Sequence, residues 1–186
     1  MGEPAMNKKT KELLSNLLYL LGVIGVTWLL ITFVGQRTNV DGSSMEPMLI
    51  DGDNLIVDKI TYRFRDPERF DVIVFPVKYD NNRKYIKRII GLPGETVLID
   101  EAGNIYIDGE LLPEAYGKET IQPDTIGIAS DPVVLGENEY FVLGDNRNNS
   151  RDSRTLIVGN IKRKDIIGRA WVRIWPLNKI GFIKHQ

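Results

Sequence analysis

The chain contains no cysteine, and its single histidine, His185, is the next-to-last of 186 residues. Without cysteine the protein can form no disulfide, thiolate nucleophile or thiolate metal site. A Ser-His-Asp triad would have to use a chain end, which is frayed in most proteins, and a zinc site would have at most one imidazole. We therefore expect neither a histidine-based triad nor a zinc centre.

An excess of positive charge is also missing, since 24 Lys and Arg residues stand against 25 Asp and Glu residues. Proteins that bind nucleic acid usually carry a basic surface, so we expect no nucleic-acid partner. The length suits one domain of ordinary size with its own core and leaves little room for a second.

One long apolar run is present, from Leu13 to Val34, with 22 residues and no charge. As a helix rising about 1.5 Å per residue it would reach roughly 33 Å, enough for a hydrocarbon core of ~30 Å. A cleaved signal peptide would have a shorter apolar part, of about 7 to 15 residues, and an A-x-A-like end. No alanine lies between Ala5 and Ala102. The run therefore predicts a permanent transmembrane anchor at 13–34.

Lysines lie on one side of this run, since three occur among residues 8–11 and only Arg37 closely follows it. By the positive-inside rule, residues 1–12 stay in the cytoplasm. Residues 36–186 then form the extracytoplasmic domain of a single-pass protein of the cell membrane, beside membrane lipid. The short basic run 162–164 could meet anionic lipid, although a solvated turn is the commoner role of such a run.

Beyond the anchor the apolar residues fall in short runs bounded by Gly, Pro, Asn and Asp, which predicts a mostly β domain. Asp108 and Gly109 predict a hairpin turn. Residues 113–138 show no sustained pattern and predict a loop or insertion within the domain. The predicted strands are 54–60, 72–77, 85–90, 96–99, 105–107, 140–143 and 166–175.

Two adjacent serines follow the anchor in the stretch DGSSMEP, residues 41–47. Neighbouring residues of an extended chain point to opposite faces, so only one of Ser43 and Ser44 can readily meet a given partner. A serine hydroxyl is a weak nucleophile that needs a base within hydrogen-bond reach. With histidine effectively excluded, lysine is the natural candidate for that base.

Lys87 stands in the strand-like stretch YIKRII, residues 85–90. A lysine acts as a base near neutral pH only where apolar surroundings lower its pKa. Alternation puts Lys87 on the face of Tyr85 and Arg88 on the opposite face, and it leaves open which of the two cations points inward. Arg88 stays charged and cannot serve as a base. An edge strand with both cations in water is the alternative.

A polar loop, GDNRNNSRDSR at residues 144–154, follows the strand-like stretch YFVL. Its Gly, Asp, Asn, Ser and Arg residues can hydrogen-bond the loop's own backbone and form ion pairs. A solvated surface turn would have the same composition.

Taken together, these segments resemble the type I signal peptidases, the membrane-anchored Ser/Lys proteases that remove signal peptides from exported proteins. The resemblance runs along nearly the whole chain, through VDGSSMEPML, RFDVIVFP, YIKRIIGLPGE and YFVLGDNRNNSRDSR in the family's order. The single anchor and short outer domain are most similar to the forms found in Gram-positive bacteria and their relatives. The resemblance implies a signal-peptidase-like β catalytic domain after one transmembrane helix, acting without a cofactor.

The family's Ser-Met-x-Pro box implies that Ser44, which directly precedes Met45, is the nucleophile and that Ser43 is a bystander. The family's Tyr-Ile-Lys-Arg box implies Lys87 as the general base. Ser150 is implied as the hydrogen-bonding partner that orients the Lys87 ammonium group. The resemblance further implies structural ion pairs beneath the site, with Arg88 a possible partner of Asp145, among Arg88, Asp145, Asp152 and Arg154.

The resemblance also implies that the substrate lies extended, with small side chains one and three residues before the cut in shallow apolar pockets. The positions that match these pockets are Met45, Val74, Tyr85 and Ile86.

Three positions depart from the family pattern. Met48 stands where Thr is usual, and Asn148 stands where the loop more often has Asp. Gly42 occupies a place where some relatives have a serine that donates to the oxyanion, so only backbone N–H groups could stabilise that charge here.

Two rival readings remain. A self-cleaving repressor-type Ser/Lys protease shares the catalytic fold, but it should carry a DNA-binding segment in place of the anchor. A catalytically inactive, membrane-tethered β domain could bind extended peptides, although the joint presence of Ser44, Lys87 and Ser150 argues for activity.

Overall fold

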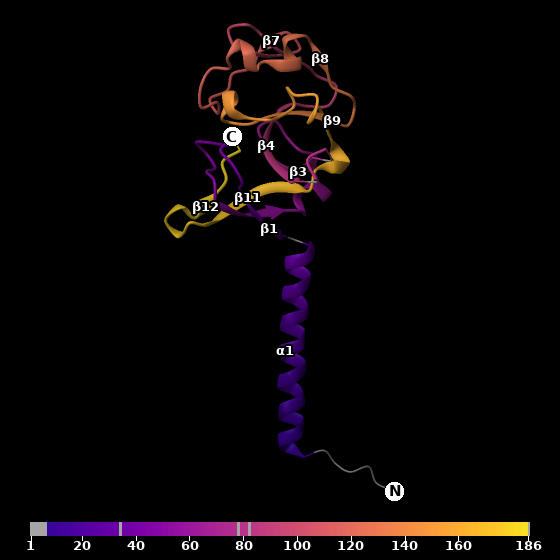
Figure 1. Ribbon diagram of the computed structural model, residues 1–186. Helices are drawn as coiled ribbons and strands as arrows, with labels where there is room; N and C mark the ends of the chain where they lie inside the picture. Colours follow the sequence, from indigo (N-terminus) through magenta and orange to yellow (C-terminus); the bar gives the residue numbers. More distant parts are fainter. Residues whose placement is uncertain (1–6, 34, 78, 82, 186) are drawn as a thin grey trace.

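The computed structural model describes residues 7–33, 35–77, 79–81 and 83–185, without the side chains of residues 29–33. One long helix, α1 (Lys8–Phe33), precedes a folded domain and extends away from it (Figure 1). The exposed fraction of its apolar side chains is high, with 71% at Leu13 and 62% at Trp28. The domain therefore does not bury the described apolar surface of this helix.

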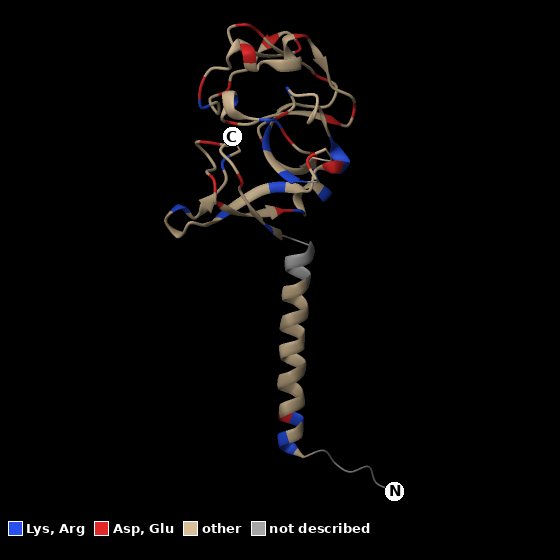
Figure 2. Ribbon diagram, in the orientation of Figure 1, with Lys and Arg blue, Asp and Glu red and all other residues tan. Residues whose placement is uncertain are grey.

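The described charges of α1 lie only at its N-terminal end, as Figure 2 shows. No proline interrupts the helix, and its commonest residue, leucine, has a high helix propensity. Among the described residues, no helix has both the length and the apolar character needed to cross a membrane. The end of the predicted anchor, residues 29–34, lies outside the residues whose side chains are described.

A large antiparallel sheet forms most of the domain, in the order β1-β2-β11-β3-β4-β9-β10, with β12 paired to β11. Strands distant in the sequence are neighbours in this order, since β11 lies between β2 and β3 and β9 pairs with β4. Its strands are β1 (Gly35–Asn39), β2 (Asn54–Asp58), β3 (Val72–Val77), β4 (Arg83–Gly91), β9 (Glu139–Leu143), β10 (Ile161–Lys162), β11 (Gly168–Trp175) and β12 (Gly181–Phe182).

A smaller sheet, in the order β7-β6-β5-β8, covers the end of the domain farthest from α1 (Figure 1). Asp108 and Gly109 join β6 to β7 with φ values of 51° and 85°, as a tight two-residue hairpin requires, so the predicted hairpin is confirmed. The strands of this sheet are β5 (Thr96–Ile99), β6 (Ile105–Ile107), β7 (Glu110–Leu111) and β8 (Val133–Val134).

The predicted mostly β domain is confirmed, and strands 72–77, 96–99 and 105–107 have the predicted bounds. The short strands β1, β8, β10 and β12 were not predicted, because β1 has no apolar side chain and the other three have only two residues each. Single 3-10 turns lie at η1 (Thr61–Arg63), η2 (Pro123–Thr125), η3 (Gly127–Ser130), η4 (Arg147–Asn149), η5 (Arg163–Asp165) and η6 (Leu177–Lys179).

The segment 113–138 is more ordered than the predicted loop or insertion. It contains η2, η3 and β8, and β8 pairs with β5. Isolated apolar residues spaced irregularly along it, among them Ile121 and Leu135, are buried in the core of the smaller sheet. Because the spacing follows no regular period, the sequence pattern could not reveal this packing.

One apolar cluster supports the face of the large sheet that carries the two serines. Met45, Leu49 and Leu55 are fully buried in it, together with Ile86 of β4 and Ala170 of β11. Burial of a side chain as large as Leu or Met stabilises the fold by roughly 1.5 to 3 kcal/mol. The serine segment is therefore fixed to the sheet by the residues that directly follow it.

Candidate active site

Ser44 lies in a turn that a glycine and a buried methionine hold in place. Gly42 has a φ of 90°, a conformation that favours glycine, and its N–H donates to the Asp51 carboxylate at 2.8 Å. Met45 is 1% exposed. The Ser44 carbonyl accepts a hydrogen bond from the Asn146 N–H at 3.1 Å, which ties this turn to the polar loop 144–154.

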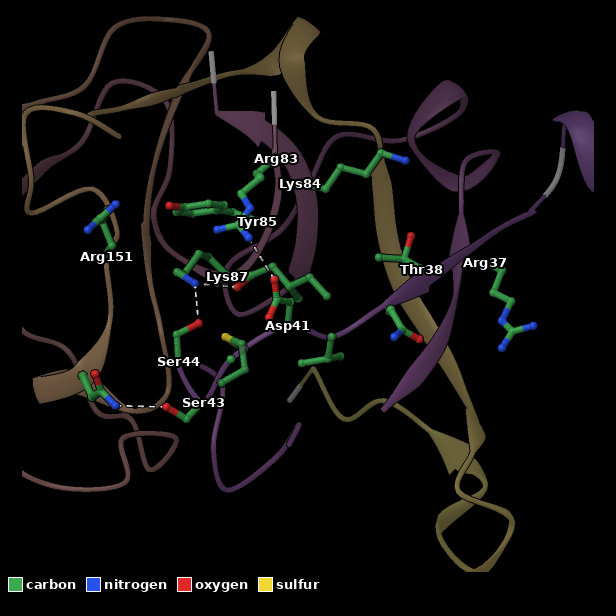
Figure 3. Close-up of a pocket in the computed structure, with 16 residues that line it drawn as sticks. Arg37, Thr38, Asp41, Ser43, Ser44, Arg83, Lys84, Tyr85, Lys87 and Arg151 are labelled. Atoms are coloured by element: carbon green, nitrogen blue, oxygen red, sulfur yellow. Dashed lines mark hydrogen bonds and ion pairs between the residues drawn. The ribbon is translucent and has the colours of Figure 1, made fainter. Parts of the chain in front are cut away.

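Lys87 reaches Ser44 from β4. Strand β4 pairs with β3 along Arg83 to Arg88, and this register sets Lys87 opposite Ile73. The Lys87 side chain is buried, and Nζ donates to Ser44 Oγ at 2.6 Å and to the Ile86 carbonyl at 3.0 Å (Figure 3). The edge-strand alternative, in which this lysine is solvated, is therefore wrong.

Burial lowers the pKa of Lys87 from 10.5 to about 8. The carboxylates of Asp152 and Asp145 act against this change, and the Arg154 guanidinium adds to it. No carboxylate makes a hydrogen bond to Nζ among the described residues, so desolvation dominates. A lysine with this pKa is substantially neutral at mildly alkaline pH and can then accept a proton from a hydroxyl.

The adjacent serines have different partners. Ser43 Oγ accepts a hydrogen bond from Asn149 Nδ2 at 2.9 Å, and the Ser43 carbonyl accepts one from Asn146 Nδ2 at 3.1 Å. Figure 3 shows the two hydroxyls pointing to different partners, with only Ser44 at Lys87. The structure thus gives the two serines different partners, although both lie in a turn and not in an extended strand.

Ser150 lies close to this pair but does not bond to the lysine. Its Oγ is buried and has no hydrogen-bond partner among the described residues, so the predicted bond to Lys87 is not made in this structure. A Cβ added at Gly144 would lie 2.3 Å from Ser150 Oγ and 2.4 Å from the Ser44 carbonyl oxygen. Only glycine at position 144 allows the loop to approach Ser44 this closely.

Arg88, on the opposite face of β4, pairs with Asp145 through two bonds of 2.8 Å. Both side chains are buried, and the Arg88 guanidinium lies 3.9 Å from the centroid of the Tyr116 ring. Arg88 also donates to Met48 Sδ at 3.1 Å. The thioether at position 48 thus provides a weak acceptor where the family usually has Thr.

Asp152 and Arg154 form a second buried pair, with Arg154 Nε donating to Asp152 Oδ1 at 2.8 Å. Asp152 Oδ2 also accepts the Gly144 N–H at 3.1 Å. The residues predicted as ion pairs beneath the site therefore hold both ends of the polar loop. Because the charges are buried and hydrogen-bonded, this loop is not a solvated surface turn.

Sequence reasoning missed Arg147 of this loop and gave no partner for Asn148. Arg147 is buried and forms an ion pair of 2.7 Å with Glu114, a residue of the predicted insertion. Asn148 Nδ2 donates to the Thr120 carbonyl at 2.9 Å, which the carboxylate of an aspartate could not do. Asn148 in place of the usual Asp therefore allows a hydrogen bond to segment 113–138, which packs on this loop. Nothing in the local sequence marks either long-range partner.

A groove of about 760 Å³ runs along Ser44 and Lys87 (Figure 3). Met45, Tyr85 and Ile86 line it, as the resemblance implied. Val74 is not among the residues that line it, and it lies fully buried on β3 opposite Ile86. The expected place of Val74 at a pocket surface is corrected accordingly.

The terminus around His185 is not frayed, which corrects the sequence-based expectation. His185 Nδ1 accepts a hydrogen bond from the Val72 N–H at 3.0 Å, and Ile183 packs in the core. Burial lowers the pKa of His185 to about 4. Neither ring nitrogen bonds to a serine among the described residues, and Nε2 has no partner there.

The geometry thus combines a buried amine of lowered pKa, a serine hydroxyl 2.6 Å away and an adjacent groove. These are the parts that serine-lysine acyl transfer requires. The groove borders β4 at Arg83–Lys87, where no second strand pairs, because β9 pairs with β4 only from Arg88 onward. An extended peptide could add to this free strand edge.

Comparison with known proteins identifies the family. Residues 12–175 match the family of signal peptidases, peptidase S26. The chain is 43% identical over 157 residues to the probable signal peptidase I-2 of Synechocystis, covering 82% of this chain and 68% of that protein. It is 32% identical over 188 residues to signal peptidase I P of Bacillus subtilis subsp. natto, covering 96% of this chain and all of that protein.

A solved structure is also similar, that of a signal peptidase I from Enterococcus faecalis, with 36% identity and a TM-score of 0.46. The match covers 56% of this chain and 97% of that one. With its family matched over most of its length, the chain belongs to the peptidase S26 signal peptidases and is a type I signal peptidase, a serine endopeptidase of protein secretion whose substrates are signal peptides of preproteins.

Proposed function

We propose that Ser44 is the nucleophile and Lys87 the general base of this signal peptidase. The observation that carries the proposal is the 2.6 Å contact between Lys87 Nζ and Ser44 Oγ, made by a buried lysine whose pKa is about 8. Neutral Lys87 accepts the Ser44 proton as Oγ attacks the scissile carbonyl. The resulting ammonium then gives this proton to the leaving amine, which completes the acyl-enzyme.

Deacylation uses the same base. Neutral Lys87 accepts a proton from a water molecule that attacks the Ser44 ester, and it returns the proton to Ser44 Oγ as the ester bond breaks. The oxyanion of both steps forms next to the Ser44 N–H, which donates to no other group in the described part of the chain. Because Gly42 has no side chain, backbone N–H groups carry this stabilisation.

The polar loop 144–154 holds Ser44 and Lys87 in position. The Arg88–Asp145 and Asp152–Arg154 pairs hold the loop that bears Ser150 and that hydrogen-bonds the Ser44 carbonyl. The unpartnered hydroxyl of Ser150 lies in this buried layer and is available to orient the Lys87 ammonium group once the proton is transferred.

The substrate pairs with the free edge of β4 over Arg83–Lys87. Main-chain hydrogen bonds there accept varied signal sequences, while the shallow apolar surface of Met45, Tyr85 and Ile86 accepts small side chains. We infer that these side chains are one and three residues before the cut. A bulky residue just before the cut should stop cleavage, because a shallow cavity cannot take added volume without strain.

The N-terminal helix is proposed to anchor the domain at the cell membrane in a single pass. Members of this family are membrane-anchored. The exposed apolar side chains of α1 and the lysines at its start support this role for residues 13–34. In this arrangement residues 1–12 are cytoplasmic and residues 36–186 extracytoplasmic. Protease added outside intact spheroplasts should digest the domain and spare an N-terminal tag, and the reverse result would contradict this topology.

Contact with membrane lipid is supported by exposed aromatic and aliphatic residues around β11, η6 and β12. Figure 1 shows β11 and β12 at the end of the domain nearest α1. Trp and Tyr side chains favour the interface between lipid and water. The exposed residues are Trp171, Trp175, Leu177, Ile180 and Phe182.

Cleavage of a preprotein by the detergent-solubilised full chain tests the proposed catalytic roles. The masses of the products should place the cut after a small residue. Ser44→Ala should abolish cleavage and labelling by a covalent serine reagent, whereas Ser43→Ala, its matched control, should retain most activity. Binding without cleavage by the wild-type chain would instead support an inactive domain that binds extended peptides, and equal loss from both substitutions in folded protein would mean that Ser44 is not the nucleophile.

A further inference from the structure

The groove beside Ser44 carries a concentration of positive charge that the catalytic steps do not use. Apart from Lys87, its lining includes four cations and one carboxylate, that of Asp41. The whole chain has slightly more acidic than basic residues, so this lining is a local feature. A cleft lined by one sign of charge concentrates ligands of the opposite sign. The four cations are Arg37, Arg83, Lys84 and Arg151.

Two of these arginines have partners within the chain. Arg37 donates to Asn54 Oδ1 from Nε at 2.9 Å and from Nη2 at 2.6 Å. Arg83 forms an ion pair of 3.5 Å with Asp41, which stands on the segment that carries the serines. A substrate carboxylate that bound Arg83 would therefore have to displace one that is already present.

Arg151 is exposed, as they are, but it forms no ion pair with any carboxylate of the described residues. It lies beside Tyr85, whose hydroxyl donates to Asp80 at 2.8 Å. Burial and this hydrogen bond raise the pKa of Tyr85, and the Arg151 guanidinium opposes the rise. The cation is thus held at the wall of the groove with capacity for a further carboxylate.

The position of Arg151 decides which part of a substrate it meets. Under the proposed function, residues before the cut lie along β4 from Arg83 toward Lys87. Residues after the cut must then leave on the other side of Ser44. Figure 3 shows Arg151 and Arg37 on opposite sides of Ser44 and Lys87, with Lys84 of β4 on the Arg37 side. Asn149, from the same loop as Arg151, also lines the groove.

We propose that Arg151 is a specificity-determining residue that binds an acidic side chain within the first three residues after the cut. Preproteins with an acidic mature N-terminus are then cleaved faster than those with a basic one. Guanidinium groups bind carboxylates through paired hydrogen bonds, and no internal carboxylate has to be displaced from Arg151. The inference rests on the proposed function, because that function sets the direction of the substrate in the groove.

Charge-variant peptides test this assignment with the full chain in uncharged detergent. One preprotein-derived peptide carries Glu, Gln or Lys at each of the first three positions after the cut in turn. At one of these positions the wild type should cleave the Glu peptide about fivefold faster than the Lys peptide in kcat/KM, the scale of a solvent-accessible ion pair. Added salt should reduce this ratio. Arg151→Gln should bring the ratio to about one, and Arg151→Glu should invert it.

Two control variants separate Arg151 from charge in general. Arg37→Gln changes the other end of the same groove (Figure 3), and Lys162→Glu changes an exposed lysine of β10 outside it. Both should keep the wild-type ratio. A wild-type ratio of one at all three positions, or an Arg151→Glu enzyme with an unchanged ratio, would overturn the proposal.

Anionic lipid is the other ligand that the cation could meet, and mixed micelles with phosphatidylglycerol distinguish it. If Arg151 substitutions alter cleavage only in the presence of this lipid, and equally for all three peptides, Arg151 serves lipid headgroups and the proposal is wrong. The Gln peptide separates a failure of the proposed function from a failure of the proposed role of Arg151. Its resistance to the wild type would contradict the proposed function, whereas its cleavage without any charge preference would contradict only the role of Arg151.

Discussion

Two buried cations lie on opposite faces of β4, and their surroundings differ. Lys87 and Arg88 are adjacent and are 3% and 1% exposed. On the Lys87 face the nearest partners are the Ser44 hydroxyl and the Ile86 carbonyl, both uncharged, and burial lowers the pKa of Lys87 to about 8. On the other face Arg88 meets the carboxylate of Asp145 in a two-bond pair.

The difference shows how one strand can hold both an amine of lowered pKa and a fixed charge. Burying a cation is costly unless it loses its proton or gains a hydrogen-bonded counter-ion. Lysine can take the first course near neutral pH and arginine cannot, so the order of the two residues along β4 assigns the reactive and the structural face. Replacement of Lys87 should therefore remove activity, and loss of the counter-ion of Arg88 should lower stability.

Lys87→Arg should have the largest effect on activity. It keeps the positive charge but removes the group that can release a proton, so kcat/KM should fall by about a thousandfold or more, within the usual scale of general-base catalysis. Lys87→Met should be equally inactive, while Lys162→Arg, outside the groove, should match the wild type in the same peptide-cleavage assay. Activity within tenfold of the wild type in Lys87→Arg would show that Lys87 is not the base.

Asp145→Asn should have the largest effect on stability, because it leaves the Arg88 charge buried without its counter-ion. We expect the free energy of unfolding to fall by about 3 to 5 kcal/mol, measured by denaturant titration of the full chain in detergent. Asp41→Asn is the matched control, since its ion pair with Arg83 is largely exposed and should contribute little. Equal losses from the two substitutions would mean that burial does not distinguish the pairs.

Lys87→Met should stabilise the protein while inactivating it. The pKa of Lys87 is about 8 in the folded protein against an ordinary value of 10.5, so the unfolded chain binds more protons between these pH values. Wild-type stability therefore rises with pH across this window. The gain from Lys87→Met should be about 3 kcal/mol below pH 8, at about 1.4 kcal/mol per pKa unit, and should vanish near pH 10.5. A gain that does not depend on pH would indicate better apolar packing in place of a removed charge.

His185→Ala should have the smallest effect, measured as the pH dependence of cleavage in this variant and in the wild type. The rate should rise with pH through an apparent pKa of about 8, as Lys87 loses its proton. His185→Ala should leave this limb in place and lower the free energy of unfolding by about 1 kcal/mol, because the Val72 N–H loses its acceptor. If the rate of this variant no longer rose with pH, His185 and not Lys87 would be the base.

Local patterns along the chain predicted the parts that depend on near neighbours. The Asp108-Gly109 turn and the strand 72–77 follow from turn chemistry and short apolar runs, and the structure has both. The choice between Ser43 and Ser44 followed from the resemblance and from alternation, and their contacts agree with it. The order within segment 113–138, the burial of Val74 and the docking of His185 could not be predicted, because each depends on residues far away in the chain.

The sequence by itself determined that no thiol chemistry is possible, because cysteine is absent, and alternation placed Lys87 and Arg88 on opposite faces. Only the tertiary structure decided that Lys87 is buried beside a serine hydroxyl and Arg88 beside a carboxylate. That outcome required Ser44, 43 residues away, to approach Lys87, and Asp145 to occupy the Arg88 face. A pKa depends on the solvation and charges around a group in space, and the strand order of the sheet sets these surroundings.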